Sequence, residues 1–175
     1  SEDKKKFYSI IFFLLALLSS EEAISLPFLI LAYEIVFSKH HETSKKVLNL
    51  LKKIKLYFIL LLFYIIGRFL VIGQIARDST YIAGTFYTTM LTMSKVIIKY
   101  LTLLVFPVNL SLNDSLPFST TVFDLSVIFS LIIIFFVIFY AFKQLSRNKL
   151  ISFGIFWFFI TLIPFYNIIP ITSLY

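Results

Sequence analysis

The basic residues of this chain are confined to short segments that separate long apolar stretches. Twelve of the 16 Lys and Arg residues lie in three patches, at residues 4–6, 39–55 and 143–149. An excess of Lys and Arg in the loops on one side of a membrane is the positive-inside pattern, which sets the orientation of a polytopic membrane protein. The pattern predicts that the three patches face the cytoplasm and that the helix ends between them face the opposite side.

Composition indicates the same class of protein. Hydrophobic residues make up 59% of the 175 residues and charged residues only 14%, whereas soluble domains are nearer half apolar and about a quarter charged. We therefore expect a multi-pass integral membrane protein, in the plasma membrane of a prokaryote or the endoplasmic reticulum of a eukaryote. The net charge of +7 does not indicate nucleic-acid binding, because the excess flanks apolar stretches. Anionic membrane lipids are the expected partners there.

Helix lengths and loop charges predict an all-α fold, a polytopic transmembrane helix bundle that occupies residues 1–175. A spanning helix needs about 20 apolar residues. Five spans are expected, near residues 7–19, 23–37, 56–72, 122–141 and 150–165. The loops at 38–55 and 142–149 are then cytoplasmic, and part of the first is expected to lie on the inner leaflet as an amphipathic helix.

The first two spans are separated by the acidic pair Glu21 and Glu22. A single helix through this point would place both carboxylates in the membrane, at a cost of about 2.5–3.5 kcal/mol each. The basic flanks on both sides also favour the cytoplasm. A hairpin that turns at the outer surface is therefore predicted.

Residues 88–106 must begin and end on the same side of the membrane, because the third span ends outside and the fourth begins outside. At 100° per residue, one narrow polar stripe contains Thr88, Thr92, Lys95, Lys99 and Thr102. This pattern predicts an amphipathic helix in the outer interface, with its lysines toward water or headgroups. Pro107 is expected to end it.

Four basic residues lie outside the cytoplasmic patches: Arg68, Arg77, Lys95 and Lys99. An arginine inside a span is a functional-site hypothesis, because its burial is costly unless it is paired. A structural pairing with a carboxylate or a carbonyl group is the alternative, and Glu21 or Glu22 is the expected partner of Arg68. The two lysines are either snorkelling anchors or anion ligands. We predict that the four basic residues line one outward-facing cavity for a lipid-linked phosphate, with Glu21 and Glu22 as supporting polar groups.

Other chemistry is sparse in the sequence. Cysteine is absent, so neither a disulfide framework nor a thiolate metal site is predicted. His40 and His41 are adjacent, which favours a solvated loop over metal ligation. Nucleotide-binding, hydrolase and zinc-protease motifs are missing. No metal, cofactor or catalytic residue is therefore assigned.

Three runs of the sequence resemble, in order, segments of one family. LLALLSSEEAISLPFLILAYE resembles a helical-hairpin signature of polytopic glycosyltransferases of the GT-C class. IKYLTLLVFPVNLSLNDSLP resembles the amphipathic helix and Pro-containing exit of the branch that carries tetratricopeptide repeats. FGIFWFFITLIPFYNIIPI is similar to the next span of that branch. The chain thus resembles the transmembrane and tetratricopeptide-repeat O-mannosyltransferase-like proteins.

The resemblance implies an enzyme that transfers a sugar from a polyprenyl-phosphate donor to an acceptor protein or glycan on the extracytoplasmic face. It also implies that the chain is a fragment, because the family's acidic catalytic motif precedes residue 1 and its repeats follow residue 175. A divalent metal would be held by residues outside this chain. Glu21 matches the family's turn, but Ser20 stands where that turn usually has Lys.

A non-catalytic membrane scaffold or lipid-binding subunit derived from the same fold is the alternative. It is favoured by the change at Ser20 and by the lack of a carboxylate motif in these residues. A transporter is a weaker alternative, since such proteins often contain inverted repeats and no internal repeat is visible.

The predicted topology can be tested by single-cysteine labelling, because the chain has no native cysteine. A Ser44→Cys variant in intact cells should react with an impermeant maleimide only after the membrane is permeabilised. Labelling from outside would contradict the positive-inside assignment and every span derived from it.

Overall fold

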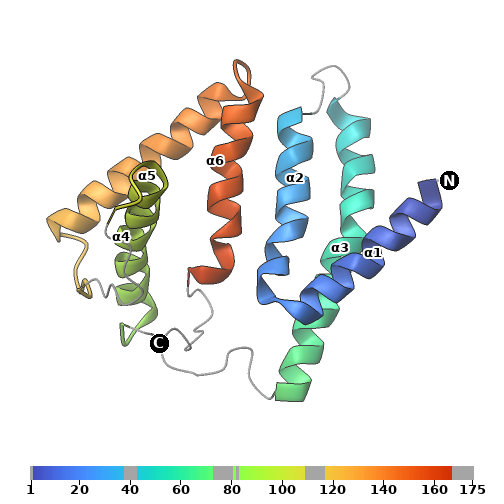
Figure 1. The fold of residues 1–175 in the computed structure, drawn as a ribbon, viewed down its shortest axis with the longest axis horizontal. Coiled ribbons are helices and arrows are strands. Elements are labelled where there is room, and N and C mark those ends of the chain that lie inside the picture. Colours follow the sequence, from blue (N-terminus) through green and yellow to red (C-terminus); the bar gives the residue numbers. More distant parts are fainter. Residues whose placement is uncertain (1, 38–42, 73–80, 82, 109–116, 167–175) are drawn as a thin grey trace. The chain divides into compact units, whose positions relative to one another are not determined.

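A computed structural model describes residues 2–37, 43–72, 81, 83–108 and 117–166, and all regular structure in these residues is helical (Figure 1). The helices are α1 (Glu2–Ser19), the 3-10 helix η1 (Glu21–Ser25), α2 (Leu26–Phe37), α3 (Thr43–Ile72), α4 (Phe86–Val105), α5 (Leu125–Gln144), α6 (Lys149–Thr161) and the 3-10 helix η2 (Ile163–Phe165). The predicted all-α class is confirmed for the described residues.

Two of the described helices, α4 and α5, are long and apolar enough to cross a membrane. Shorter apolar helices cover Phe7–Ser19 and Lys149–Phe165. Length and composition alone are a weak indication of association with a membrane, and a bundle with several crossings stays a prediction. The helix expected at 88–106 is present as α4, and its predicted position in the outer interface also stays a prediction.

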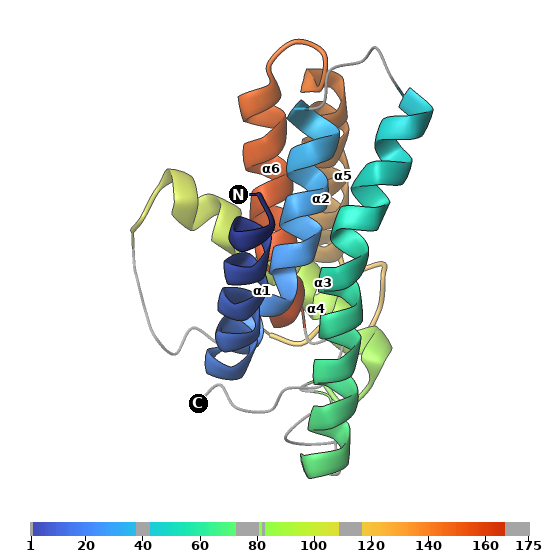
Figure 2. The ribbon, with the colours of Figure 1, turned by 90° about the vertical axis from the view of Figure 1, so that its right-hand side faces the viewer.

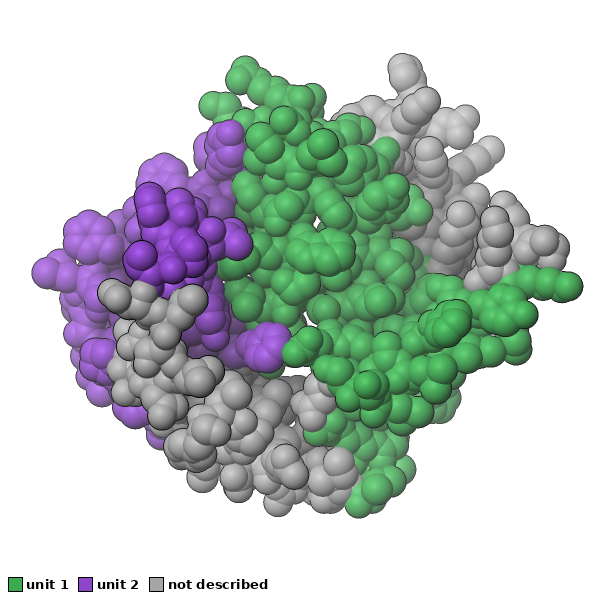
Figure 3. All heavy atoms as spheres, viewed as in Figure 1, with its two compact units in different colours: residues 1–75, 143–164 green, residues 76–142, 165–175 purple. Residues whose placement is uncertain are grey.

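The chain divides into two compact units (Figure 3). Unit 1 consists of residues 1–75 and 143–164, and unit 2 consists of residues 76–142 and 165–175. Unit 1 therefore contains α1, η1, α2, α3 and α6. Unit 2 contains α4 and nearly all of α5.

The core of unit 1 forms where α1 packs on α3. Phe13 and Leu17 of α1 are buried with Leu61 of α3, and apolar residues of η1 and α2 pack against this cluster. The Tyr57 ring of α3 meets the Phe13 ring edge-on at 5.4 Å, and its hydroxyl lies 2.7 Å from the Ser9 hydroxyl. One hydrogen bond and one aromatic contact thus fix the register of α1 along α3.

The predicted break between the first two helices is present. Ser20 has an extended backbone (φ −148°, ψ 138°), and the chain then makes η1 before α2 begins at Leu26. The first helix is longer than expected, because it starts at Glu2 and includes the lysines at 4–6. Beyond the turn, α2 packs side by side with α6 (Figures 1 and 2).

The span expected at 56–72 and the amphipathic helix expected within 38–55 belong to one helix, and the cytoplasmic position of 38–55 stays a prediction. The structure has one continuous helix of 30 residues over Thr43–Ile72, which is about 45 Å long. Residues 43–66 contain neither Gly nor Pro, and Leu and Lys are good helix formers. The change from basic to apolar sequence therefore does not interrupt the helix backbone.

The helix starts of unit 2 are set by hydroxyl and carboxylate residues. Thr85 caps α4, and its side chain and that of Thr88 each accept the other's backbone N–H at 3.2 Å. Gly84 precedes this cap with φ +85°, a conformation that glycine adopts without strain. Before α5, which begins at Leu125, the Thr121 hydroxyl donates to the Asp124 carboxylate at 3.3 Å.

Burial of neighbouring leucines on α1 gives a matched test of the unit 1 core. Leu17 is 1% exposed, whereas Leu18 is 76% exposed. Leu17→Ala should lower the free energy of unfolding in detergent by about 2 kcal/mol or more through cavity formation. Leu18→Ala should change it by about 0.5 kcal/mol or less. Equal losses in a denaturant titration would contradict the packing of α1 on α3.

Candidate functional site

The turn η1 is an ordered structure with its own hydrogen bonds. The Ser20 hydroxyl accepts the Glu22 N–H at 3.3 Å, and the Ser25 hydroxyl donates to the Glu22 carbonyl oxygen at 2.7 Å. The Ala23 N–H donates to the Ser20 carbonyl oxygen at 3.3 Å. Glu22 itself is exposed, so the turn presents a carboxylate to its surroundings.

Arg68 of α3 is half-buried and is oriented by a tyrosine one turn earlier. Its Nη1 atom donates to the Tyr64 hydroxyl at 3.1 Å. Residues four apart lie on one face of a helix, and Leu61 and Tyr57 extend the same face toward the start of α3. Arg68 also takes part in a further interaction.

The Tyr64–Arg68 pair belongs to the part of α3 beside the η1 turn. Tyr64 packs against the core cluster of Phe13, Leu17 and Leu61, and so does Ala23 of η1. Figures 1 and 2 both show α3 continuing past the level of η1 before it ends. The structure therefore brings the region of Arg68 and the polar turn to the same end of unit 1.

In unit 2, the polar stripe of α4 is the docking face for the chain that leads into α5. The Ser119 N–H donates to the Thr92 hydroxyl at 3.1 Å, and both side chains are buried. Lys95 is half-buried, and its ammonium donates to the Pro117 carbonyl oxygen. This differs from the expectation that the stripe faces water or headgroups, because residues 117–119 cover part of it.

The predicted site residues fall in different places. Arg68 and Glu22 lie in unit 1, whereas Lys95 and Lys99 lie in unit 2. Lys99 is half-buried and engaged in an interaction. Arg77 and the side chain of Glu21 lie outside the described residues. The shared cavity of four basic residues, and the pairing of Arg68 with Glu21 or Glu22, stay predictions.

Sequence reasoning missed the partners of two of these cations. Tyr64 carried a signal, since a hydrogen-bonding residue four positions before Arg68 on a helix is a natural partner. No sequence signal indicated the Pro117 carbonyl oxygen as the partner of Lys95, because a contact with a backbone oxygen 22 residues away cannot be predicted from composition. Glu34 was also passed over, although a half-buried acid within an apolar helix is a functional signal in itself.

No group of three or more His, Cys, Asp or Glu side chains able to hold a metal occurs in the part of the chain that the structure describes. No family model, curated protein or solved structure matches this chain. The resemblance to GT-C glycosyltransferases therefore stays a prediction.

The contact between α4 and residues 117–119 can be tested at Thr92. Thr92→Val should leave the buried Ser119 N–H without its acceptor, at a cost of about 1–3 kcal/mol. Hydrogen exchange at the Ser119 amide should then accelerate by about tenfold or more.

Thr102→Val is the matched control on the same helix. The exposed Thr102 hydroxyl donates only within α4, to the Ile98 carbonyl oxygen at 2.8 Å. The Thr102→Val variant should leave the rate of hydrogen exchange at the Ser119 amide unchanged. If the rate of hydrogen exchange at the Ser119 amide is unchanged in Thr92→Val, the Thr92–Ser119 hydrogen bond does not hold residues 117–119 on α4.

Proposed function

We propose that this chain is a multi-pass membrane segment of a glycosyltransferase that uses a polyprenyl-phosphate sugar. Its part in the reaction is to bind the phosphate of the lipid at the extracytoplasmic face. The acceptor is a protein or glycan, and the catalytic acid or base and any divalent metal come from outside these residues.

The observation that supports this proposal is the placement of Arg68. A guanidinium on an apolar helix is costly to maintain in a membrane, yet here its orientation is fixed by the Tyr64 hydroxyl. The guanidinium group has five N–H donors in a planar fork that matches phosphate oxygens. The Tyr64 bond directs one of these donors and limits the conformations of the side chain.

The chemistry of such a transfer explains why a cation is needed. The acceptor oxygen attacks the anomeric carbon, and the bond from that carbon to the phosphate oxygen breaks. The phosphate leaves with the electron pair, and a general base takes the acceptor's proton. A preorganised cation stabilises the negative charge that develops on the leaving phosphate. Arg68 is the residue proposed for this role, with Arg77, Lys95 and Lys99 as the further predicted ligands.

A non-catalytic lipid-binding scaffold of the same fold is the second candidate. The role of Ser20 favours it. Where the resembled family usually has a lysine, the Ser20 hydroxyl caps η1 by accepting the Glu22 N–H. A position that serves the backbone of the turn cannot also supply a cation to a phosphate. The two candidates share lipid binding and differ only in whether sugar is transferred.

Lipid-phosphate binding can be tested at Arg68. Arg68→Ala should weaken binding of a polyprenyl phosphate to the purified chain in detergent by about tenfold or more, because a charge-assisted bidentate contact is lost. Arg68→Lys should recover part of the affinity, since it keeps the charge and loses the fork. Tyr64→Phe should have a smaller effect, because only the orienting bond is lost.

Lys55→Ala is the control, because Lys55 is an exposed cation on the same helix α3. The affinity of the Lys55→Ala variant for polyprenyl phosphate should match that of the unmodified chain. If Arg68→Ala and Lys55→Ala reduce the affinity equally, Arg68 has no specific role and the proposal fails.

A further inference from the structure

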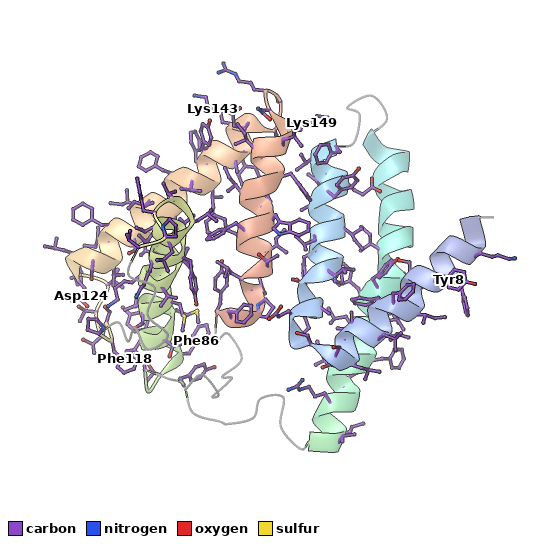
Figure 4. All side chains as sticks on the ribbon, in the orientation of Figure 1. Tyr8, Phe86, Phe118, Asp124, Lys143 and Lys149 are labelled. Carbon is purple, nitrogen blue, oxygen red and sulfur yellow. The ribbon has the colours of Figure 1, made fainter. Side chains whose placement is uncertain are left out.

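The turn between α5 and α6 carries a compact group of cations. Lys143, Arg147 and Lys149 lie within seven positions, and no Asp or Glu follows Asp124 in the sequence. Lys143 and Arg147 are exposed and Lys149 is half-exposed. Figure 4 shows Lys143 and Lys149 at the same end of the helices, on either side of this turn.

Hydrogen bonds hold the turn in one shape. The N–H groups of Arg147 and Asn148 donate to the Gln144 carbonyl oxygen at 3.1 and 2.9 Å. The Asn148 side chain caps α6 by accepting the Ile151 N–H at 3.3 Å. The three cations therefore project from an ordered backbone.

Aromatic residues gather on α2 and α6 next to this turn. Phe153 of α6 packs edge-on against Tyr33 and Phe37 of α2, with ring centroids 5.8 and 5.5 Å away. Trp157 adds a fourth ring, 5.6 Å from Phe153. We call these four residues the aromatic cluster. Tyr33 is 52% exposed and Trp157 49% exposed, so one side of the cluster is open.

The cations and the aromatic cluster form one continuous surface of unit 1. Lys149, Phe153 and Trp157 are four residues apart on α6 and therefore follow one face of the helix. At 1.5 Å per residue, Trp157 lies about 12 Å along the axis from Lys149. This is close to the half-thickness of a bilayer's hydrocarbon core, about 15 Å.

We propose that this surface binds an anionic phospholipid. The headgroup phosphate contacts Arg147 and Lys149, with Lys143 near by, and an acyl chain lies along the aromatic cluster. Charge complementarity favours an anionic occupant. A zwitterionic or cationic lipid brings a positive charge of its own to a turn with three cations, and no Asp or Glu follows Asp124 in the sequence. The half-buried Glu34, next to Tyr33 on α2, is the acid nearest to the cluster in sequence. The inference requires only that the chain lies in a membrane, and it is independent of the glycosyltransferase proposal.

The single tryptophan makes the test direct, because Trp157 is the only one in the chain. The full chain is reconstituted in two sets of vesicles with the same minor fraction of phosphatidylglycerol in phosphatidylcholine. In the first set, the acyl chains of the phosphatidylglycerol are brominated. In the second set, the phosphatidylglycerol is unlabelled, and an equal amount of the phosphatidylcholine has brominated acyl chains. Surface charge is identical, so a difference in quenching of Trp157 reports which lipid lies beside it.

Quenching by the brominated phosphatidylglycerol should indicate about fivefold enrichment over phosphatidylcholine. The preference should disappear in an Arg147→Gln/Lys149→Gln double variant. It should persist in Lys4→Gln/Lys55→Gln, which removes the same charge from two other exposed lysines. Equal quenching by both lipids in the unmodified chain, or quenching by neither, would overturn the proposal whether or not the variants fold. Loss of the preference in the control variant would do so too.

Discussion

The organisation of unit 1 depends on the turn at Ser20–Ser25. The Ser20 backbone is extended there, so α1 ends before the two carboxylates and α2 begins after them. The turn then contacts α1, α2 and α6, and its apolar residues pack against the cluster of Phe13, Leu17 and Leu61. The position of this turn thus determines where the helices of unit 1 meet.

A second constraint is that polar groups among apolar helices need partners. The Ser9 and Tyr57 hydroxyls bond each other, Arg68 donates to Tyr64, and Thr92 accepts the buried Ser119 N–H. The second and third of these bonds satisfy part-buried or buried groups that would otherwise be costly to remove from water. One of these bonds, from Arg68 to Tyr64, also orients a cation.

The sequence was informative where one strong signal acted alone. The acidic pair at 21–22 predicted the first turn, and Pro107 marked the end of α4. It did not show that the amphipathic helix expected within 38–55 continues without a break into the span expected at 56–72. Pairings between distant segments, such as Lys95 with the Pro117 carbonyl oxygen, leave no trace in periodicity. They depend on how loops return to the helices, which side-chain patterns do not encode.

Photocrosslinking with a polyprenyl phosphate that carries a diazirine close to its phosphate tests the central claim most directly. The full chain in a membrane is irradiated, digested and analysed by mass spectrometry. The account predicts that crosslinked peptides include residues 64–68 or the turn at 20–25, and that unlabelled polyprenyl phosphate competes for them. Crosslinks confined to residues 143–149, or spread over all exposed apolar helices without competition, would contradict a lipid-phosphate site at Arg68.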